Sequence, residues 1–159
     1  MDSTRRSDPT VEAKLADLEG GEQALAFGSG MAAEAATFLA HARTGDHLIG
    51  LGDVYGGTFD LLGTNLPQLG IETSFLRADQ VGDLDSAFTD RTRLVFLETP
   101  TNPALDVFEI ADIASRAHAH GALLVVDNTF ASPVNQRPLE HGADLWSTRR
   151  PSTWVVTPT

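Results

Sequence analysis

The stretch that decides the fold is residues 110–127, IADIASRAHAHGALLVVD. Its first part, residues 110–121, carries apolar residues at helical spacing and ends in a glycine, a common helix stop. Its second part, residues 122–127, is a continuous apolar run that ends in Asp127, as expected of a central strand buried on both faces. A helix that leads directly into such a strand is typical of a parallel α/β sheet.

The same alternation of helix and strand extends outward along the chain. Further strands are predicted at residues 47–51, 71–76 and 93–98 and from residue 143. Further helices are predicted at residues 9–19 and from about residue 31, and residues 56–69 are predicted to form a turn and a helix. Because the later strands are continuous apolar runs, the sequence predicts an α/β fold with a mostly parallel sheet covered by helices on both faces.

Composition excludes several classes of function. The 159 residues include no cysteine, so disulfides, thiolate metal sites and cysteine nucleophiles are excluded. The 22 acidic residues outnumber the 11 basic ones, and a net charge of −11 opposes binding to nucleic acid or anionic lipid. His118, His120 and His141 lack metal-like spacing, so no metal site is predicted. We find no membrane-spanning run and no secretory leader, and therefore expect a cytoplasmic protein.

A glycine turn, GSGMAA at residues 28–33, leads into a predicted helix. Free backbone N–H groups and the helix dipole favour an anion there, so the turn is either a phosphate cradle or an ordinary glycine turn. Its spacing also fits the dinucleotide fingerprint, with Asp53 ending the next strand as a ribose-binding acid would. Against an NAD-type oxidoreductase domain, the apolar run before the glycines is short and follows a long helical segment.

Three other residues follow predicted strands and could hold a planar ligand. Asp127 is costly to bury unpaired, and it either pairs with a protonated ring nitrogen, such as that of pyridoxal phosphate, or caps the next turn. Tyr55, beside two glycines, either stacks on a cofactor ring or packs as an ordinary aromatic. Asn102, between two prolines, either donates a hydrogen bond to a phenolic oxygen or lies in a rigid turn.

Six stretches in order resemble the Cys/Met-metabolism family of pyridoxal-phosphate-dependent enzymes. They are SDPTVEAKLADLEGG, AFGSGMAA, GDVYGGTF, LVFLETPTNP, VVDNTFASP and PLEHGAD, and the similarity covers residues 7–145. The resemblance implies part of a fold-type I pyridoxal-phosphate-dependent transferase large domain, at residues 1–145. It also implies a homotetramer that acts on a small amino-acid substrate in transsulfuration, by β- or γ-elimination or γ-replacement on cystathionine, methionine or O-acylhomoserine.

The resemblance further implies cofactor contacts for six residues of this sequence. Gly30 and Met31 would meet the cofactor phosphate, Tyr55 would stack on the ring, Asn102 would face the phenolic oxygen, Asp127 would pair with the pyridine nitrogen, and Thr129 would lie close to that acid. A Tyr-x-Arg segment that lends phosphate contacts to the neighbouring subunit is incomplete here, because Ser3 stands in the place of the tyrosine.

The sequence departs from the family after residue 145. There the family continues roughly L-V-V-H-S-T-T-K-Y-L-G-G-H-S-D, in which Ser and Thr bind phosphate and Lys forms the Schiff base. The only lysine of this chain is Lys14, so no catalytic residue is assigned and the chain is expected to be inactive. One inserted nucleotide after the Leu145 codon, with permitted codons, restores the family sequence. We therefore interpret residues 146–159 as an aberrant out-of-frame tail, the alternative being a natural divergent tail. For the chain itself, a non-catalytic interaction remnant stays open as an alternative function.

Overall fold

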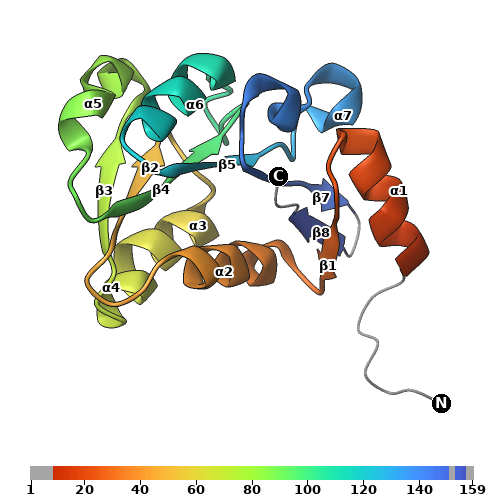
Figure 1. Cartoon of the computed structure of the whole chain (residues 1–159), viewed down its shortest axis with the longest axis horizontal. Coiled ribbons are helices and arrows are strands. Elements are labelled where there is room, and N and C mark those ends of the chain that lie inside the picture. Colours follow the sequence, from red (N-terminus) through yellow and green to blue (C-terminus); the bar gives the residue numbers. More distant parts are fainter. Residues whose placement is uncertain (1–8, 151–152, 157–159) are drawn as a thin grey trace.

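A computed structural model describes residues 9–150 and 153–156 (Figure 1). Its main sheet has five strands in the order β3-β2-β4-β5-β6, and every neighbouring pair is parallel. The strands are β2 (His47–Leu51), β3 (Glu72–Leu76), β4 (Thr92–Glu98), β5 (Leu123–Asp127) and β6 (Leu145–Ser147). The predicted parallel sheet is thus confirmed.

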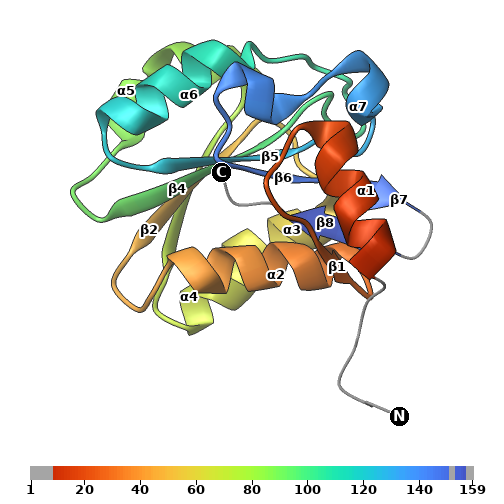
Figure 2. The same cartoon turned by 45° about the vertical axis from the view of Figure 1, so that its right-hand side comes forward.

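Helices cover both faces of this sheet (Figure 2). On one face lie α2 (Gly30–His41), α3 (Gly56–Asp60) and α4 (Leu66–Gln68), and on the other lie α5 (Leu84–Ala87) and α6 (Ile110–Ala119). Phe38 of α2 meets Phe96 of β4 edge to face, with ring centroids 5.3 Å apart, in the core on the α2 side of the sheet. Alternate residues of each strand therefore pack into separate apolar layers, as expected of a sheet that is buried on both faces.

The helix predicted over residues 56–69 is not a regular α-helix. Between α3 and α4 the chain forms a π-helical segment, η1 (Leu61–Asn65). Pro67, at the start of α4, has no backbone N–H and cannot donate to the carbonyl of Gly63. The wide π-helical turn of η1 lies next to this missing hydrogen bond, and the chain continues through α4 to β3.

The apolar run before the glycine turn lies outside the parallel sheet. This strand, β1 (Leu25–Phe27), pairs antiparallel with β8 (Thr153–Val156), which also pairs with β7 (Arg149–Arg150). A dinucleotide fingerprint requires its glycines to follow a strand of the parallel sheet. The fold therefore contradicts the dinucleotide interpretation of residues 28–33.

The first helix, α1 (Pro9–Glu19), closes one end of the molecule over β6 (Figure 2). Its Leu15 and Ala16 pack with Ala24 against Trp146, which is fully buried. The short helices η2 (Ala78–Asp83), α7 (Ser132–Asn135) and η3 (Pro138–His141) complete the described elements. None of the helices in these residues is long and apolar enough to cross a membrane.

Candidate functional site at the carboxyl edge of the sheet

Three polar side chains form a row where β4, β5 and β6 end. Glu98 is the register partner of Asp127, and Asp127 is the register partner of Ser147. Phe96, two residues before Glu98, packs in the core beneath α2, so the two-residue period of a strand turns the whole row toward α2. All three side chains are buried. The carboxyl edge, where α/β sheets bind ligands, thus carries a polar row in an otherwise apolar layer.

Asp127 lies at the centre of this row. Its Oδ1 accepts a hydrogen bond of 2.8 Å from the backbone N–H of Thr129. Burial raises the pKa of Asp127 to about 6, and the hydrogen bonds from Thr129 oppose this rise. In the part of the chain that the structure describes, no basic side chain forms an ion pair with Asp127. The site therefore offers a buried acid whose charged form still needs a cationic partner.

Ser147 is a second incompletely satisfied group of the row. Its side chain is 1% exposed, and its Oγ has no hydrogen-bond partner among residues 9–150 and 153–156. Buried hydroxyl groups are almost always hydrogen-bonded. An unpaired hydroxyl group therefore lies beside the buried carboxyl group of Asp127.

Glu98 connects the row to α3. Its Oε2 accepts a hydrogen bond of 2.7 Å from the backbone N–H of Tyr55, the residue that precedes α3. Burial raises the pKa of Glu98 to about 7, and the nearby charge of Asp127 contributes to the rise. Glu98 is the last residue of the strand predicted at residues 93–98, but the sequence analysis predicted no role for it.

Glu34 brings a third buried carboxyl group to the same place. It lies on α2, is 2% exposed, and accepts a hydrogen bond of 2.7 Å on Oε2 from Thr58 Oγ1. Burial raises the pKa of Glu34 to about 8, with further contributions from the charges of Asp127 and Glu98. No three acidic or imidazole side chains of the described residues are arranged to hold a metal ion. Burial therefore favours the protonated form of each of these carboxyl groups.

The N-terminus of α2 faces the same edge with free donors. Ser29 caps the helix, and its Oγ accepts a hydrogen bond of 3.2 Å from the backbone N–H of Ala32. The N–H groups of Gly30 and Met31 have no acceptor within the helix, since the first turn of any α-helix lacks one. The first turn carries no acidic residue. This end of α2 can therefore bind an anion such as a phosphate.

Met31 and Tyr55 come together around Gly57. A Cβ atom on Gly57 would lie 2.8 Å from both Met31 Sδ and Tyr55 Cε1, so any larger residue would displace one or both of these side chains. The Tyr55 side chain is 47% exposed. Its ring is therefore available to stack on a planar ligand next to the N-terminus of α2.

Asn102 occupies a neighbouring position. It lines a hollow of about 330 Å³ with Asp53, Phe59, Phe75 and other residues at the ends of β2 and β3. Within the described residues, no hydrogen bond joins Asn102 to Tyr55 or Asp127. Of the six predicted contacts, the structure thus brings five to one edge, and it places Asn102 in the adjoining hollow.

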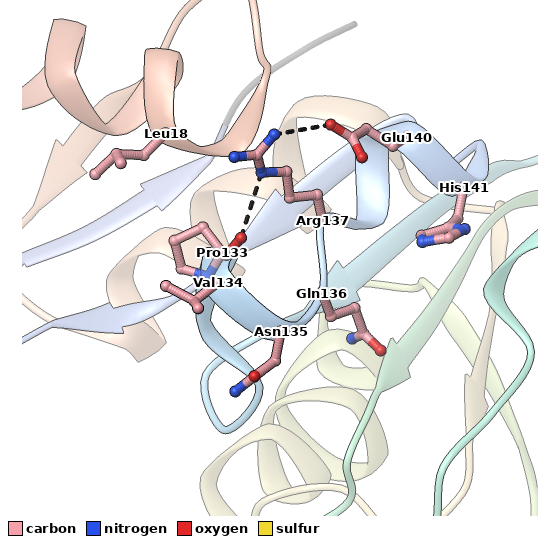
Figure 3. A pocket seen from close by; sticks show the side chains of 8 residues that line it. All are labelled: Leu18, Pro133, Val134, Asn135, Gln136, Arg137, Glu140 and His141. Carbon is pink, nitrogen blue, oxygen red and sulfur yellow. Dashed lines mark hydrogen bonds and ion pairs between the residues drawn. The ribbon is translucent and has the colours of Figure 1, made fainter.

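A larger hollow of about 460 Å³ lies elsewhere, between α1, α7 and η3 (Figure 3). Arg137 lies over it, with Nη1 donating to Glu140 Oε1 at 3.0 Å and Nε donating to the carbonyl oxygen of Pro133 at 3.3 Å. None of the six predicted cofactor contacts lines this hollow. Lys14, on α1, is exposed.

Comparison with known proteins assigns the family. The sequence model of the family of Cys/Met metabolism PLP-dependent (pyridoxal-phosphate-dependent) enzymes matches residues 2–148. The chain belongs to this family. Its membership, with the position of β1, excludes the dinucleotide-binding alternative.

Named relatives of the family support this assignment. The chain is 44% identical over 145 residues to a cystathionine beta-lyase of Lactococcus lactis subsp. cremoris (strain MG1363), and 42% identical over 146 residues to an L-methionine gamma-lyase of Pseudomonas deceptionensis. These matches cover 89% of this chain but only 38% and 37% of the relatives.

Solved structures of the family superpose on the whole fold. The metB protein of Corynebacterium glutamicum matches with a TM-score of 0.92 and 36% identity, over 98% of this chain and 44% of that one. A cystathionine gamma-lyase of Lactobacillus plantarum, crystallised with L-serine, matches with a TM-score of 0.90 and 35% identity, over 100% of this chain and 46% of that one.

The sequence held a signal for Glu34 that went unused. Glu34 stands between alanines in a helix whose Ala33 and Phe38 pack into the core. A lone glutamate on or next to the buried face of such a helix requires a partner. The sequence could not name that partner, because Thr58 lies 24 residues further along the chain.

Proposed function

We propose that this chain is the cofactor-binding part of a pyridoxal-phosphate-dependent enzyme that acts at the β- or γ-carbon of a sulfur amino acid or an O-acylhomoserine. The observation that carries the proposal is Asp127, which is buried at the sheet edge without a basic partner in the described chain. The protonated ring nitrogen of pyridoxal phosphate supplies such a partner, and the ring then acts as an electron sink for bond cleavage.

The residues of the edge fit the remaining parts of this cofactor. The N–H groups of Gly30 and Met31 would bind the phosphate, and the exposed Tyr55 ring would stack on the pyridine ring. Thr129 would keep Asp127 oriented through its N–H donation. Asn102, in the adjoining hollow, would donate to the phenolic oxygen.

The substrate class is proposed from the names of the relatives. They include lyases for cystathionine and methionine and a cystathionine gamma-synthase/O-acetylhomoserine (thiol)-lyase of Bacillus subtilis. The chain spans about 38% of the length of such relatives, so the choice between elimination and replacement belongs to the whole protein, as does assembly into a homotetramer.

We also propose that the chain as written binds the cofactor without a covalent bond and does not turn over substrate. Its only lysine, Lys14, is exposed on α1. Residues 146–159 supply no other lysine, in keeping with their interpretation as an out-of-frame tail.

Ligand titration tests the proposal. Pyridoxal phosphate should bind the 159-residue chain, NAD should not, and Asp127→Asn should weaken pyridoxal phosphate binding by about tenfold or more, as expected for loss of a buried charge pair. Asp112→Asn, at an exposed position on α6 away from the site, is the matched control and should leave binding unchanged. Saturable NAD binding that depends on Asp53 would overturn the proposal.

A further inference from the structure

Two buried glutamates of the site have no part in the cofactor contacts proposed above, yet each forms a link between elements. Glu34 joins α2 to Thr58 of α3, and Glu98 joins the end of β4 to the backbone of Tyr55. The two linked residues, Tyr55 and Thr58, flank Gly56 and Gly57. The links thus stand on either side of a glycine pair.

This arrangement matters because of what the glycine pair does to Tyr55. Gly56 and Gly57 lose more conformational freedom on folding than other residues would, so the start of α3 benefits from contacts that hold the residues on either side of the pair. A Cβ atom on Gly57 would approach Met31 Sδ and Tyr55 Cε1 to 2.8 Å, so a larger residue there would require one or both of these side chains to shift. Glycine at this position therefore leaves room for the Tyr55 ring and Met31 as they lie, and the two links hold the segment from both sides.

We propose that Glu34 and Glu98 are positioning residues, which hold the Tyr55 ring in fixed register with the phosphate end of α2 and with Asp127. The inference rests on the proposed function for the identity of the ligand. The anchoring itself is a property of this chain alone, and it can be measured without ligand.

The anchor at Glu98 acts directly on the residue that carries the ring. Tyr55 has an extended ψ of 139° and no side-chain cap hydrogen bond to α3, so the 2.7 Å bond to Glu98 is the side-chain contact that fixes its backbone N–H. Glu98 is also the register partner of Asp127. The Glu98 side chain therefore sets the distance between the Tyr55 ring and the Asp127 carboxyl group.

The anchor at Glu34 acts from the opposite side. Thr58 is fully buried, and its hydroxyl donates to a carboxyl group that lies one turn below Gly30 on α2. The groups that face Glu34 are Thr58 on α3, Glu98 on β4 and Asp127 on β5. Burial keeps Glu34 protonated at neutral pH, because its pKa is raised to about 8. The link is therefore made without a second negative charge beside Asp127.

The first test removes one hydrogen bond at a time from the full 159-residue chain. Thr58→Val deletes the donor to Glu34 and preserves side-chain shape, and it should weaken pyridoxal phosphate binding about tenfold. Thr58→Ser should restore wild-type affinity. Thr37→Val is the matched control, since the buried Thr37 hydroxyl on α2 donates only to Ala33 within its own helix. It should leave affinity within about twofold of wild type, whatever it does to stability.

The second test needs no ligand. Hydrogen exchange of the Tyr55 amide should be slow in the wild-type chain, about tenfold faster or more in Glu98→Ala, and slow again in Glu98→Gln, which keeps an acceptor oxygen. Thr37→Val should not alter it. Unchanged Tyr55 exchange in Glu98→Ala, or equal affinities of Thr58→Val and Thr37→Val, would overturn the positioning role. If the wild-type chain binds no pyridoxal phosphate but Tyr55 exchange responds to Glu98, the anchoring stands and the proposed function fails.

Discussion

Replacing Glu34 by glutamine should change how the stability of the fold depends on pH. The carboxyl group is buried beneath α2, and its pKa is raised from 4.5 to about 8, chiefly by loss of hydration. The folded state therefore binds this proton more tightly than the unfolded state. The contribution of Glu34 to the free energy of unfolding is therefore most favourable below pH 4.5. It declines as the pH rises toward about 8 and is constant above that.

The size of this effect follows from the same shift. A difference of one pKa unit corresponds to about 1.4 kcal/mol, so ionisation of Glu34 opposes folding by roughly 5 kcal/mol at alkaline pH. The free energy of unfolding of a small domain is itself about 5–15 kcal/mol. The wild-type chain should thus lose much of its stability between about pH 5 and pH 8. Glu34→Gln keeps the shape and an acceptor for Thr58, and it cannot ionise.

Urea unfolding at several pH values measures this directly. The free energy of unfolding of Glu34→Gln minus that of the wild type should rise steadily from about pH 5 to pH 8 and then level off. Glu72→Gln is the matched control: Glu72 is exposed and bonded to Arg91, which lowers its pKa. Its difference from wild type should stay flat over the same range. Parallel curves for the wild type and Glu34→Gln would refute the reasoning, because they would mean that Glu34 ionises freely in the folded chain.

Three further predictions concern the lysine, the amino end of the sheet and the tail. Borohydride treatment of the chain with pyridoxal phosphate should give no stoichiometric adduct at one site, and a specific adduct mapped by mass spectrometry beside Asp127 would contradict this. Burial lowers the pKa of His47, which bonds Thr92 and Ser74, so the free energy of unfolding of the wild type minus that of His47→Gln should fall as the pH falls below 6.5. Urea unfolding of both proteins would settle it. The gene should be resequenced across the Leu145 codon and its reading frame repaired. The repaired gene should yield a longer product that converts cystathionine, methionine or O-acetylhomoserine. A downstream sequence that encodes nothing of this family in any frame would show that the tail is native.

The architecture could be predicted because local patterns and tertiary packing agree over most of the chain. The helix at residues 9–19 and the strand at residues 47–51 match their predicted bounds, and the stretch at residues 110–127 forms α6 and β5. Strands buried on both faces leave continuous apolar runs, and such runs are visible without coordinates. The glycine turn also begins a helix, as expected.

Pairing between distant strands could not be predicted in the same way. The run at residues 24–27 has the composition of a parallel-sheet strand, yet β1 pairs antiparallel with β8. A short apolar run specifies that a strand forms but does not specify its neighbour, which depends on residues more than a hundred positions away. The dinucleotide alternative, which the shortness of this run already disfavoured, is contradicted because β1 lies outside the parallel sheet.

The sequence by itself determined the family, the alternation of helices and strands, and the placement of Gly30, Tyr55 and Asp127 at the carboxyl edge, because strand ends of a parallel sheet share one edge. Only the tertiary structure decided which carboxyl groups share that edge. Glu34 and Glu98 lie on a helix and a strand far apart in the chain, and they acquire raised pKa values and defined donors only when packing excludes water from both. Desolvation and proximity are properties of the folded molecule, and no local pattern of residues records them.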